Sequence, residues 1–105
     1  MLSQDVQLLE SFVRTLRQER PEARVWAYGS RVRETATEES DLDLCVVVDT
    51  LDRATEDRIR EIAWEEGFAH GLVISVLCYA SGEFFSGPRS ASPLVRTILR
   101  EGMVA

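Results

Sequence analysis

The stretch from Tyr28-Gly29-Ser30 to Ser40-Asp41-Leu42-Asp43-Leu44 decides the fold, because it joins a Gly-Ser turn to an acidic strand entry. Asp41 and Asp43 open the apolar run 44–48, which is typical of a buried β-strand. Side chains two residues apart lie on one face of a strand, with their Cα atoms roughly 7 Å apart. Two carboxylates placed in this way repel each other, and a hard divalent cation is a partner that such oxygen ligands favour.

Hydrophobic periodicity predicts further elements on both sides of this stretch. Helices are expected over 3–20, with Ser3 as N-cap and Pro21 as the stop, over 52–67 and from Pro93 to Gly102. Strands are expected at 24–28 and 71–79, a turn or two of helix at 31–34, and a loop at 81–92. The predicted class is α+β, a small three-stranded sheet with flanking helices in the order α-β-α-β-α-β-α.

The short connection between the strands at 24–28 and 42–48 predicts their relative direction. Parallel neighbours usually need a crossover of a dozen or more residues with a full helix, so antiparallel pairing is favoured here. Antiparallel pairing places Gly29 and Ser30, at the end of one strand, beside Asp41 and Asp43 at the start of the next.

Two groups of large side chains are assigned to the core by the same patterns. Trp26 and Tyr28 are interpreted as core residues of the first strand. In the helix at 52–67, the buried face is expected to carry Ile59, Ile62 and Ala63, together with Trp64 or Phe68.

Composition narrows the classes of function. The chain has 105 residues, of which 45% are hydrophobic, and residues 1–105 fit one domain. The net charge of −6 argues against a surface for extended nucleic-acid binding, although a nucleotide bound through metal ions stays compatible. All twelve basic residues are arginine, which excludes a phosphate-binding lysine of the Walker type and a lysine Schiff base.

Membrane and redox features are also absent from the sequence pattern. No apolar stretch approaches the roughly 20 residues of a bilayer span, and the N-terminal residues lack the pattern of a signal peptide. A cytoplasmic protein with no membrane partner is therefore expected. Cys45 and Cys78 lie in apolar strand-like runs and are expected to be buried thiols.

Gly29-Ser30 at a strand-to-helix turn is a candidate anion site, because free backbone N–H groups, a helix dipole and a hydroxyl can face a phosphate oxygen. Alone, such a pair is more often simply a turn with a cap. Together with Asp41 and Asp43 it suggests a site for phosphoryl or nucleotidyl transfer that holds two Mg²⁺ ions roughly 4 Å apart. Arg31 and Arg33 either contact phosphate or lie on a solvated helix face.

The pattern of Gly29-Ser30, ten residues and Asp41-Leu42-Asp43 resembles the signature of the DNA polymerase β-like nucleotidyltransferase superfamily. The order of elements over 3–102 is similar to that of its minimal nucleotidyltransferases. The resemblance implies a mixed sheet, with Asp41 and Asp43 as catalytic metal ligands for two Mg²⁺ ions. It implies a nucleotide-phosphate site at Gly29 and Ser30, and Arg31 completes the candidate nucleotide-binding set.

The same resemblance implies a reaction and a kind of partner. A nucleoside monophosphate, usually AMP from ATP but otherwise from another nucleoside triphosphate, is transferred to an acceptor hydroxyl. Members of this group often accompany HEPN-domain proteins, which are ribonuclease toxins, and act as antitoxins by adenylylating them. A toxin–antitoxin setting with a HEPN-type partner is therefore expected, and a homo-oligomer is left open.

Two departures from the family pattern bear on activity. Active members usually carry a third carboxylate in the next core strand, where this chain has Ser75. A serine supplies no negative charge and is a poor base without help. The second departure is Glu34, where the family often has glycine; its carboxylate could repel a triphosphate. The acidic residues considered as substitutes for the third carboxylate are Asp49, Glu65, Glu66 and Glu83.

Three hypotheses of function follow from these observations. The first is an enzyme that transfers AMP or another nucleoside monophosphate to a hydroxyl of a partner protein or small acceptor. The second is a catalytically degenerate, antitoxin-like or regulatory module that masks a HEPN-type partner, which the serine at position 75 motivates. The third is a nucleotide-sensing module.

Overall fold

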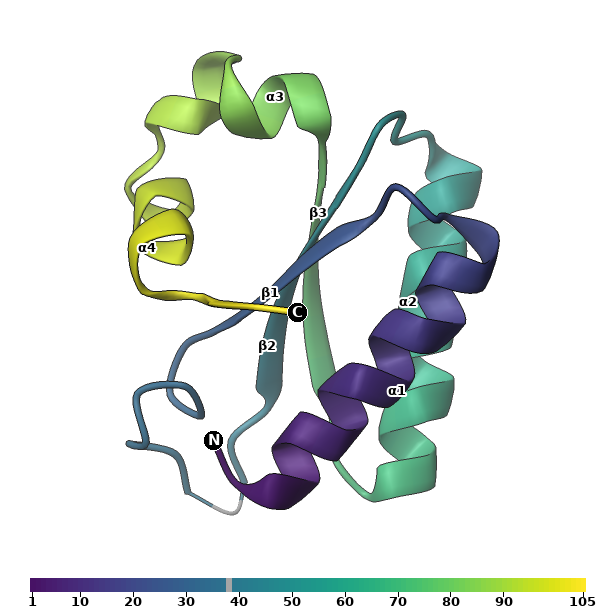
Figure 1. The fold of residues 1–105 in the computed structure, drawn as a ribbon, viewed down its shortest axis with the longest axis vertical. Helices are drawn as coiled ribbons and strands as arrows, with labels where there is room; N and C mark the ends of the chain where they lie inside the picture. The colour runs from purple at the N-terminus through teal and green to yellow at the C-terminus, as the bar shows by residue number, and fades with distance from the viewer. Residues whose placement is uncertain (38) are drawn as a thin grey trace.

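The computed structural model describes residues 1–37 and 39–105. Its elements follow one another along the chain as shown in Figure 1: α1 (Ser3–Glu19), β1 (Arg24–Tyr28), β2 (Leu42–Val48), α2 (Arg53–His70), β3 (Ile74–Ala80), α3 (Ser81–Phe85), the 3₁₀ helix η1 (Pro88–Ala91), α4 (Pro93–Glu101) and β4 (Met103–Val104). The α+β class predicted from the sequence is confirmed.

The sheet is mixed, with strand order β3-β2-β1-β4. β1 pairs antiparallel with both β2 and β4, and β2 pairs parallel with β3, so the predicted direction of the first two strands is confirmed. The prediction of three strands missed β4, which has only two residues and therefore no readable period. This strand forms because Gly102 ends α4 and the chain returns to β1, where the Ala105 N–H donates to the Val25 carbonyl at 2.9 Å.

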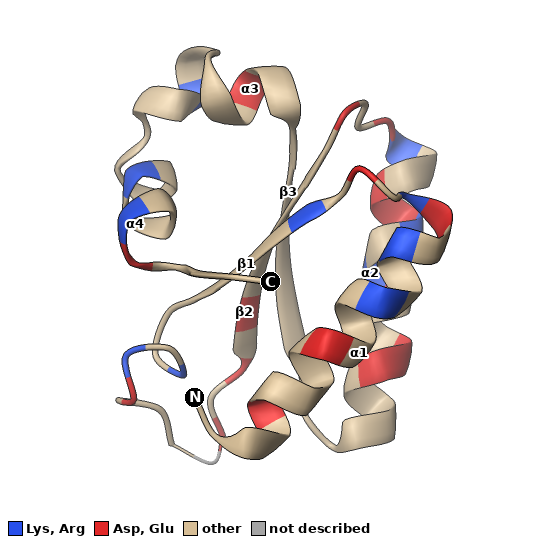
Figure 2. Cartoon of the chain, viewed as in Figure 1, with Lys and Arg blue, Asp and Glu red and all other residues tan. Residues whose placement is uncertain are grey.

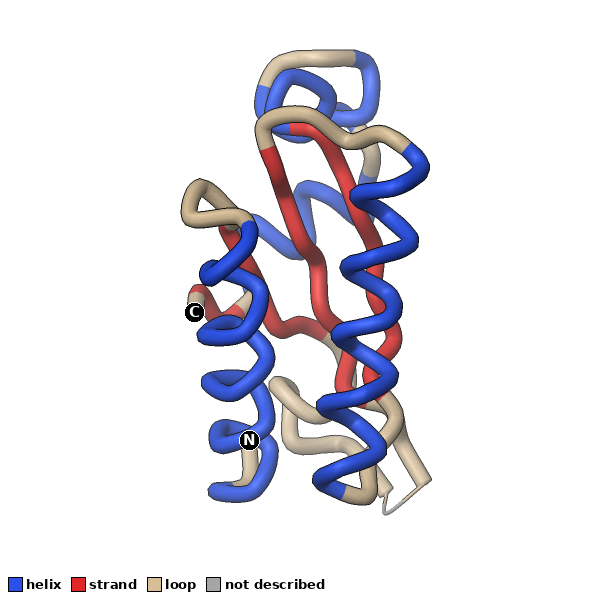
Figure 3. The backbone as a smooth tube through the Cα atoms, turned by 90° about the vertical axis from the view of Figure 1, so that its right-hand side faces the viewer, coloured by secondary structure: helices blue, strands red, loops and turns tan. Residues whose placement is uncertain are grey.

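Helices cover both faces of the sheet. α1 and α2 lie side by side over one face, where they pack against strand residues such as Val25, Leu44 and Val46 (Figure 3). α3 and α4 cover part of the other face, against Cys45 and Val47 among others (Figure 1). Because successive side chains of a strand alternate between faces, Asp43 points to the α3–α4 side, as Cys45 does.

Residues 31–34 form a turn and not the short helix that the sequence suggested. The physical reason lies at Glu34, whose φ of 62° is left-handed and incompatible with continuation of a right-handed helix. The expected loop at 81–92 also differs, since it contains α3 and η1.

The helix predicted over 52–67 runs further, to His70. Gly67 does not end it; its missing side chain makes room for the Leu72 carbonyl against the helix. Gly71, at φ 70°, is the actual C-cap. The assignment of Trp64 or Phe68 to the buried face is wrong, because the two rings are 68% and 76% exposed and stack on each other with centroids 5.3 Å apart.

The two cysteines are free thiols, as predicted. Cys45 is fully buried and Cys78 is partly buried. Within residues 1–37 and 39–105, none of the helices combines the length and the apolar character of a bilayer span.

Candidate functional site

Gly29 ends β1 against the entry of β2. Its φ of 82° lies in the left-handed region, which glycine adopts at little cost. A Cβ at this position would overlap Oδ2 of Asp43. The Arg33 N–H donates to the Gly29 carbonyl at 3.1 Å, and the Thr35 N–H to the Ser30 carbonyl at 2.9 Å. The Gly29 backbone therefore faces the Asp43 carboxylate with no side chain between them, and a larger residue would be strained and would displace that carboxylate.

Asp41 and Asp43 are the acidic pair at the entry of β2. Asp41 is exposed and precedes the strand, while Asp43 is half-buried within it and pairs with Tyr28 across the antiparallel ladder. Burial, together with the charge of Asp41, raises the pKa of Asp43, and the Arg33 guanidinium partly offsets this. In Figure 2, red marks acidic residues on β2 and on the segment that leads into it.

The donor set fits a divalent cation. Among the hydrogen bonds and ion pairs of the described residues, none engages the side chain of Asp41 or Asp43. Two neighbouring carboxylates without a hydrogen-bond donor are the kind of oxygen ligands that Mg²⁺ takes in nucleotide sites. Over residues 1–37 and 39–105, no group of three or more acidic, histidine or cysteine side chains gathers as a metal cluster would.

Ser75 lies directly beside Asp43 on the other side of β2. The parallel ladder pairs Asp43 with Ser75, so the two side chains stand on the same face, and Ser75 is exposed. Asp43 is thus flanked by Tyr28 on one neighbouring strand and Ser75 on the other. Ser75 is the residue that stands where the family resemblance leads one to expect a third carboxylate.

None of the four acidic residues considered as substitutes for the third carboxylate lies beside Asp43. Asp49 follows the opposite end of β2, about 20 Å along the strand from Asp43. Glu65 is exposed on α2, on the other side of the sheet. Glu66 accepts hydrogen bonds from Ser11 and Thr15 of α1, each at 2.7 Å. Glu83, on α3, pairs with Arg89 at 3.0 Å.

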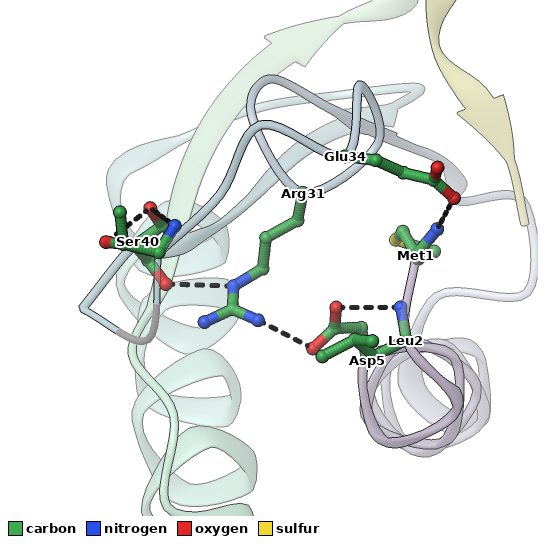
Figure 4. Close-up of polar contacts among 7 residues, drawn as sticks. Met1, Leu2, Asp5, Arg31, Glu34 and Ser40 are labelled. Atoms are coloured by element: carbon green, nitrogen blue, oxygen red, sulfur yellow. Dashed lines mark hydrogen bonds and ion pairs between the residues drawn. The ribbon is translucent and has the colours of Figure 1, made fainter.

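Arg31 and Arg33 leave the turn in different directions. The Arg31 side chain is 5% exposed, so it is not on a solvated face, and its guanidinium lies at 3.0 Å from Asp5 of α1 (Figure 4). Arg33 is exposed, and its charge lowers the pKa of Asp43. Of the two arginines, Arg33 is therefore the one near the acidic pair.

Tyr28 belongs to the site as well as to the core. Burial, followed by the negative charge of Asp43, raises the pKa of the Tyr28 phenol to about 12. The hydroxyl therefore stays protonated at neutral pH, where it can donate a hydrogen bond but cannot act as a base. Sequence reasoning missed this role, and the signal that could have found it is the ladder register opposite Asp43.

Glu34 occupies a backbone position that suits glycine. Its φ of 62° explains in physical terms why glycine would be common there, since a side chain in this region is strained. The carboxylate is 80% exposed and lies 3.6 Å from the Met1 ammonium (Figure 4). The Glu34 side chain is thus directed to the N-terminal end of α1.

Comparison with known proteins agrees with this geometry. Residues 9–104 match the nucleotidyltransferase domain family. A solved crystal structure of a toxin–antitoxin with AMP-PNP has a similar fold, with a TM-score of 0.59 and 22% sequence identity, covering 90% of this chain and 70% of that chain. No curated protein gives a significant sequence match.

The chain belongs to the nucleotidyltransferase domain family, because the match spans nearly all of its sequence. The likeness to the toxin–antitoxin structure supports the same fold.

Proposed function

We propose that the protein binds Mg²⁺ and a nucleoside triphosphate at the turn of Gly29 and Ser30 and at the carboxylates of Asp41 and Asp43. The proposed activity is transfer of a nucleoside monophosphate, AMP from ATP in the first instance, to a hydroxyl group of a partner protein or small acceptor. The observation that carries this proposal is the juxtaposition of the side-chain-free Gly29 backbone with Asp43. Membership of the nucleotidyltransferase domain family and the AMP-PNP in the similar structure support it.

Each residue of the site has a role in this proposal. Free N–H groups of the Gly29-Ser30 turn and the Ser30 hydroxyl bind phosphate oxygens. The exposed Arg33 adds positive charge beside the acidic pair. Asp41 and Asp43 hold the metal, and bound Mg²⁺ would neutralise the triphosphate and polarise the reacting phosphoryl group.

In the transfer step, the acceptor oxygen forms a bond to the α-phosphorus, and the bond from that phosphorus to the bridging β-oxygen breaks. Pyrophosphate leaves, and the acceptor proton passes to solvent. Neither Ser75 nor the protonated Tyr28 is suited to take this proton. The chain thus supplies positioning and charge, which are the main contributions of proteins to phosphoryl transfer.

A second candidate function is a binding module without turnover. Ser75 beside Asp43 favours it, because the position that could complete the metal site bears no charge. In this case the protein would act as an antitoxin-like or regulatory subunit that masks a HEPN-type partner, with nucleotide binding retained. The toxin–antitoxin assembly of the similar structure supports a protein partner for either candidate.

One experiment separates the two candidates. The purified chain is incubated with labelled ATP, Mg²⁺ and the protein that co-purifies with it. Transfer of label by the native chain, and its loss in the double variant Asp41→Ala/Asp43→Ala, supports the enzyme. The variant Asp49→Ala is the matched control, because it removes a carboxylate at the far end of the same strand.

Two outcomes contradict the enzymatic proposal. Equal labelling by the native chain and the double variant would contradict the catalytic assignment of Asp41 and Asp43. No labelling by the native chain, with the partner still bound and inhibited by both forms, would favour the binding module.

A further inference from the structure

The Arg31 side chain joins three parts of the chain that are distant in sequence. Its NH1 donates to Oδ1 of Asp5 at 3.0 Å, and its Nε donates to the Ser40 carbonyl at 2.9 Å. Asp5 is itself 1% exposed, and its Oδ2 accepts from the Leu2 N–H at 3.2 Å at the start of α1. Figure 4 shows the guanidinium between the Ser40 backbone on one side and the Asp5 carboxylate on the other.

The two ends of the site loop meet at this guanidinium. Arg31 is bonded in sequence to Ser30, at the proposed phosphate site, and Ser40 is bonded to Asp41, a proposed metal ligand. The ladder between β1 and β2 stops at Tyr28 and Asp43. Beyond this ladder, in the part of the chain that the structure describes, the Arg31–Ser40 bond alone links residues 29–33 to residues 40–41.

Among the described residues, the partners of the Arg31 guanidinium are Asp5 and the Ser40 carbonyl, and neither aspartate of the acidic pair is one of them. Arg31 is bound to α1, which packs on the face of the sheet that carries Val25 and Leu44, whereas Asp43 points to the opposite face. The arginine next to the phosphate-binding serine is therefore committed to the scaffold.

We propose that Arg31 is a positioning residue, which sets the distance between the Gly29-Ser30 turn and Asp41 through its bond to the Ser40 carbonyl. This inference rests on the proposed function, since it assigns Arg31 to the same nucleotide and metal site. Guanidinium suits this role because its planar fork presents donors to two acceptors at once. The ion pair with Asp5 neutralises the buried guanidinium, and the Nε hydrogen bond carries the positioning.

Two variants separate the two bonds of Arg31. Arg31→Lys keeps a positive charge for Asp5, but all its donors lie on one nitrogen, which cannot occupy the positions of both NH1 and Nε. Asp5→Asn removes the ion pair and leaves the Arg31 Nε free to bind Ser40. Both variants are made in the full chain, and each is measured by isothermal titration with Mg-ATP and by thermal unfolding.

The two variants should affect different quantities, one mainly the affinity for Mg-ATP and the other mainly the melting temperature. Arg31→Lys should weaken Mg-ATP binding at least fivefold and lower the melting temperature little. Asp5→Asn should lower the melting temperature more, because a buried cation loses its partner, and should keep the affinity within twofold of the native chain. An affinity within twofold for Arg31→Lys, or an affinity loss in Asp5→Asn as large as in Arg31→Lys, would overturn the positioning role.

Hydrogen exchange distinguishes failure of this inference from failure of the proposed function. If the native chain does not bind Mg-ATP, the proposed nucleotide site is wrong. The Arg31–Ser40 hydrogen bond is then tested by the exchange rates of the backbone amides of Arg33, Thr35 and Ser40, which are hydrogen-bonded within the loop. These amides should exchange at least tenfold faster in Arg31→Lys than in the native chain. Unchanged exchange would refute the positioning role whether or not nucleotide binds.

Discussion

At Gly29, a backbone requirement and a packing requirement coincide. The residue has a φ of 82°, and the Asp43 carboxylate fills the space where a Cβ would stand. Gly71 shares the first requirement, with a φ of 70°, but has no atom near the place of a Cβ. The two glycines therefore separate backbone strain from the close approach to Asp43.

Replacing Gly29 with alanine should damage the site beyond its effect on stability. Both Gly29→Ala and Gly71→Ala should lower the free energy of unfolding by about 1 to 2 kcal/mol through the left-handed backbone. Only Gly29→Ala should also weaken Mg-ATP binding, by tenfold or more. Urea unfolding and titration calorimetry on both variants measure this, and equal affinities would contradict the role of the Gly29–Asp43 contact.

Position 75 is where a substitution can add a third carboxylate to the proposed metal site. Ser75→Asp places a third carboxylate beside Asp43, so without metal it should lower the free energy of unfolding by up to about 1 kcal/mol through repulsion. Added Mg²⁺ should then raise the melting temperature of this variant more than that of the native chain. Ser75→Asn is the uncharged control of matched size, and the same response to Mg²⁺ in both variants would exclude a metal ligand at position 75.

Glu34 tests the interpretation of the turn. Glu34→Gly removes a side chain from a left-handed residue and should raise the free energy of unfolding by about 1 kcal/mol. Urea unfolding measures the change. A clear loss of stability would mean that the exposed Glu34 carboxylate matters more than its backbone conformation.

Individual residues show where sequence reasoning stops. The proximity of Gly29 and Asp43 could be predicted, because the short connection between β1 and β2 makes the two strands antiparallel neighbours. Arg31 could not be placed, since its partner Asp5 lies 26 residues away and an isolated charge in a sequence does not reveal burial.

At the scale of elements, the Glu66 carboxylate is one of the polar links between α1 and α2, beside the Arg58–Glu19 ion pair and the apolar contacts. Burial alone would raise the pKa of Glu66, but the hydroxyls of Ser11 and Thr15, with the charges of His70 and Arg14, outweigh burial and lower it below the ordinary 4.5. A carboxyl with a lowered pKa in the folded state stabilises the fold above its ordinary pKa. That stabilisation is lost as the pH falls through the pKa of the folded state.

Glu66→Gln should therefore have a pH-dependent effect. At pH 7 it should lower the free energy of unfolding by about 1 kcal/mol, as expected for hydrogen bonds to a partly exposed charge. The gap between the variant and the native chain should close as the pH falls below 4.5. Urea unfolding from pH 3 to 7 measures it, with the exposed Glu65→Gln as control; a gap that stays constant with pH would contradict the role of the charge.

The elements themselves were predicted unevenly. The strands and long helices follow from apolar periods that span many residues. All of them are present, although α2 ends three residues later than predicted and β3 begins at Ile74 and not at Gly71. The predicted short helix at 31–34 and the buried assignment of Trp64 or Phe68 are wrong. The left-handed conformation of Glu34 prevents the short helix. The exposure of Trp64 and Phe68 depends on which part of α2 is covered by the neighbouring elements, which the sequence of the helix alone does not show.

At the scale of the whole molecule, Cys45 reports on global unfolding. It is fully buried in β2 between both layers, and burial, with the nearby Cys78, raises the pKa of its thiol to about 12. Iodoacetamide should not modify Cys45 at pH 8 in the native chain and should modify it fully in urea. Mass spectrometry resolves the two cysteines, and rapid modification of Cys45 without urea would contradict this packing.

The antiparallel direction of β1 and β2 was predictable from their short connection, and the mixed sheet was expected from the family resemblance. The missed fourth strand shows the limit, since β4 is defined by where Gly102 returns the chain and not by its own two residues. The parallel ladder fixes Ser75 beside Asp43, so the departure from the family pattern at position 75 lies at the proposed metal site.

Binding of Mg-ATP at the aspartates is the central claim, and thermal unfolding tests it directly. A ligand that binds only the folded state stabilises it by about 1.4 kcal/mol for each tenfold rise in concentration above Kd, or roughly 5 to 10 °C in melting temperature for a chain of this size. The native chain and Asp49→Ala should show this rise with Mg-ATP, and Asp41→Ala/Asp43→Ala should not. No rise in the native chain at millimolar Mg-ATP, or an equal rise in the double variant, would contradict the account.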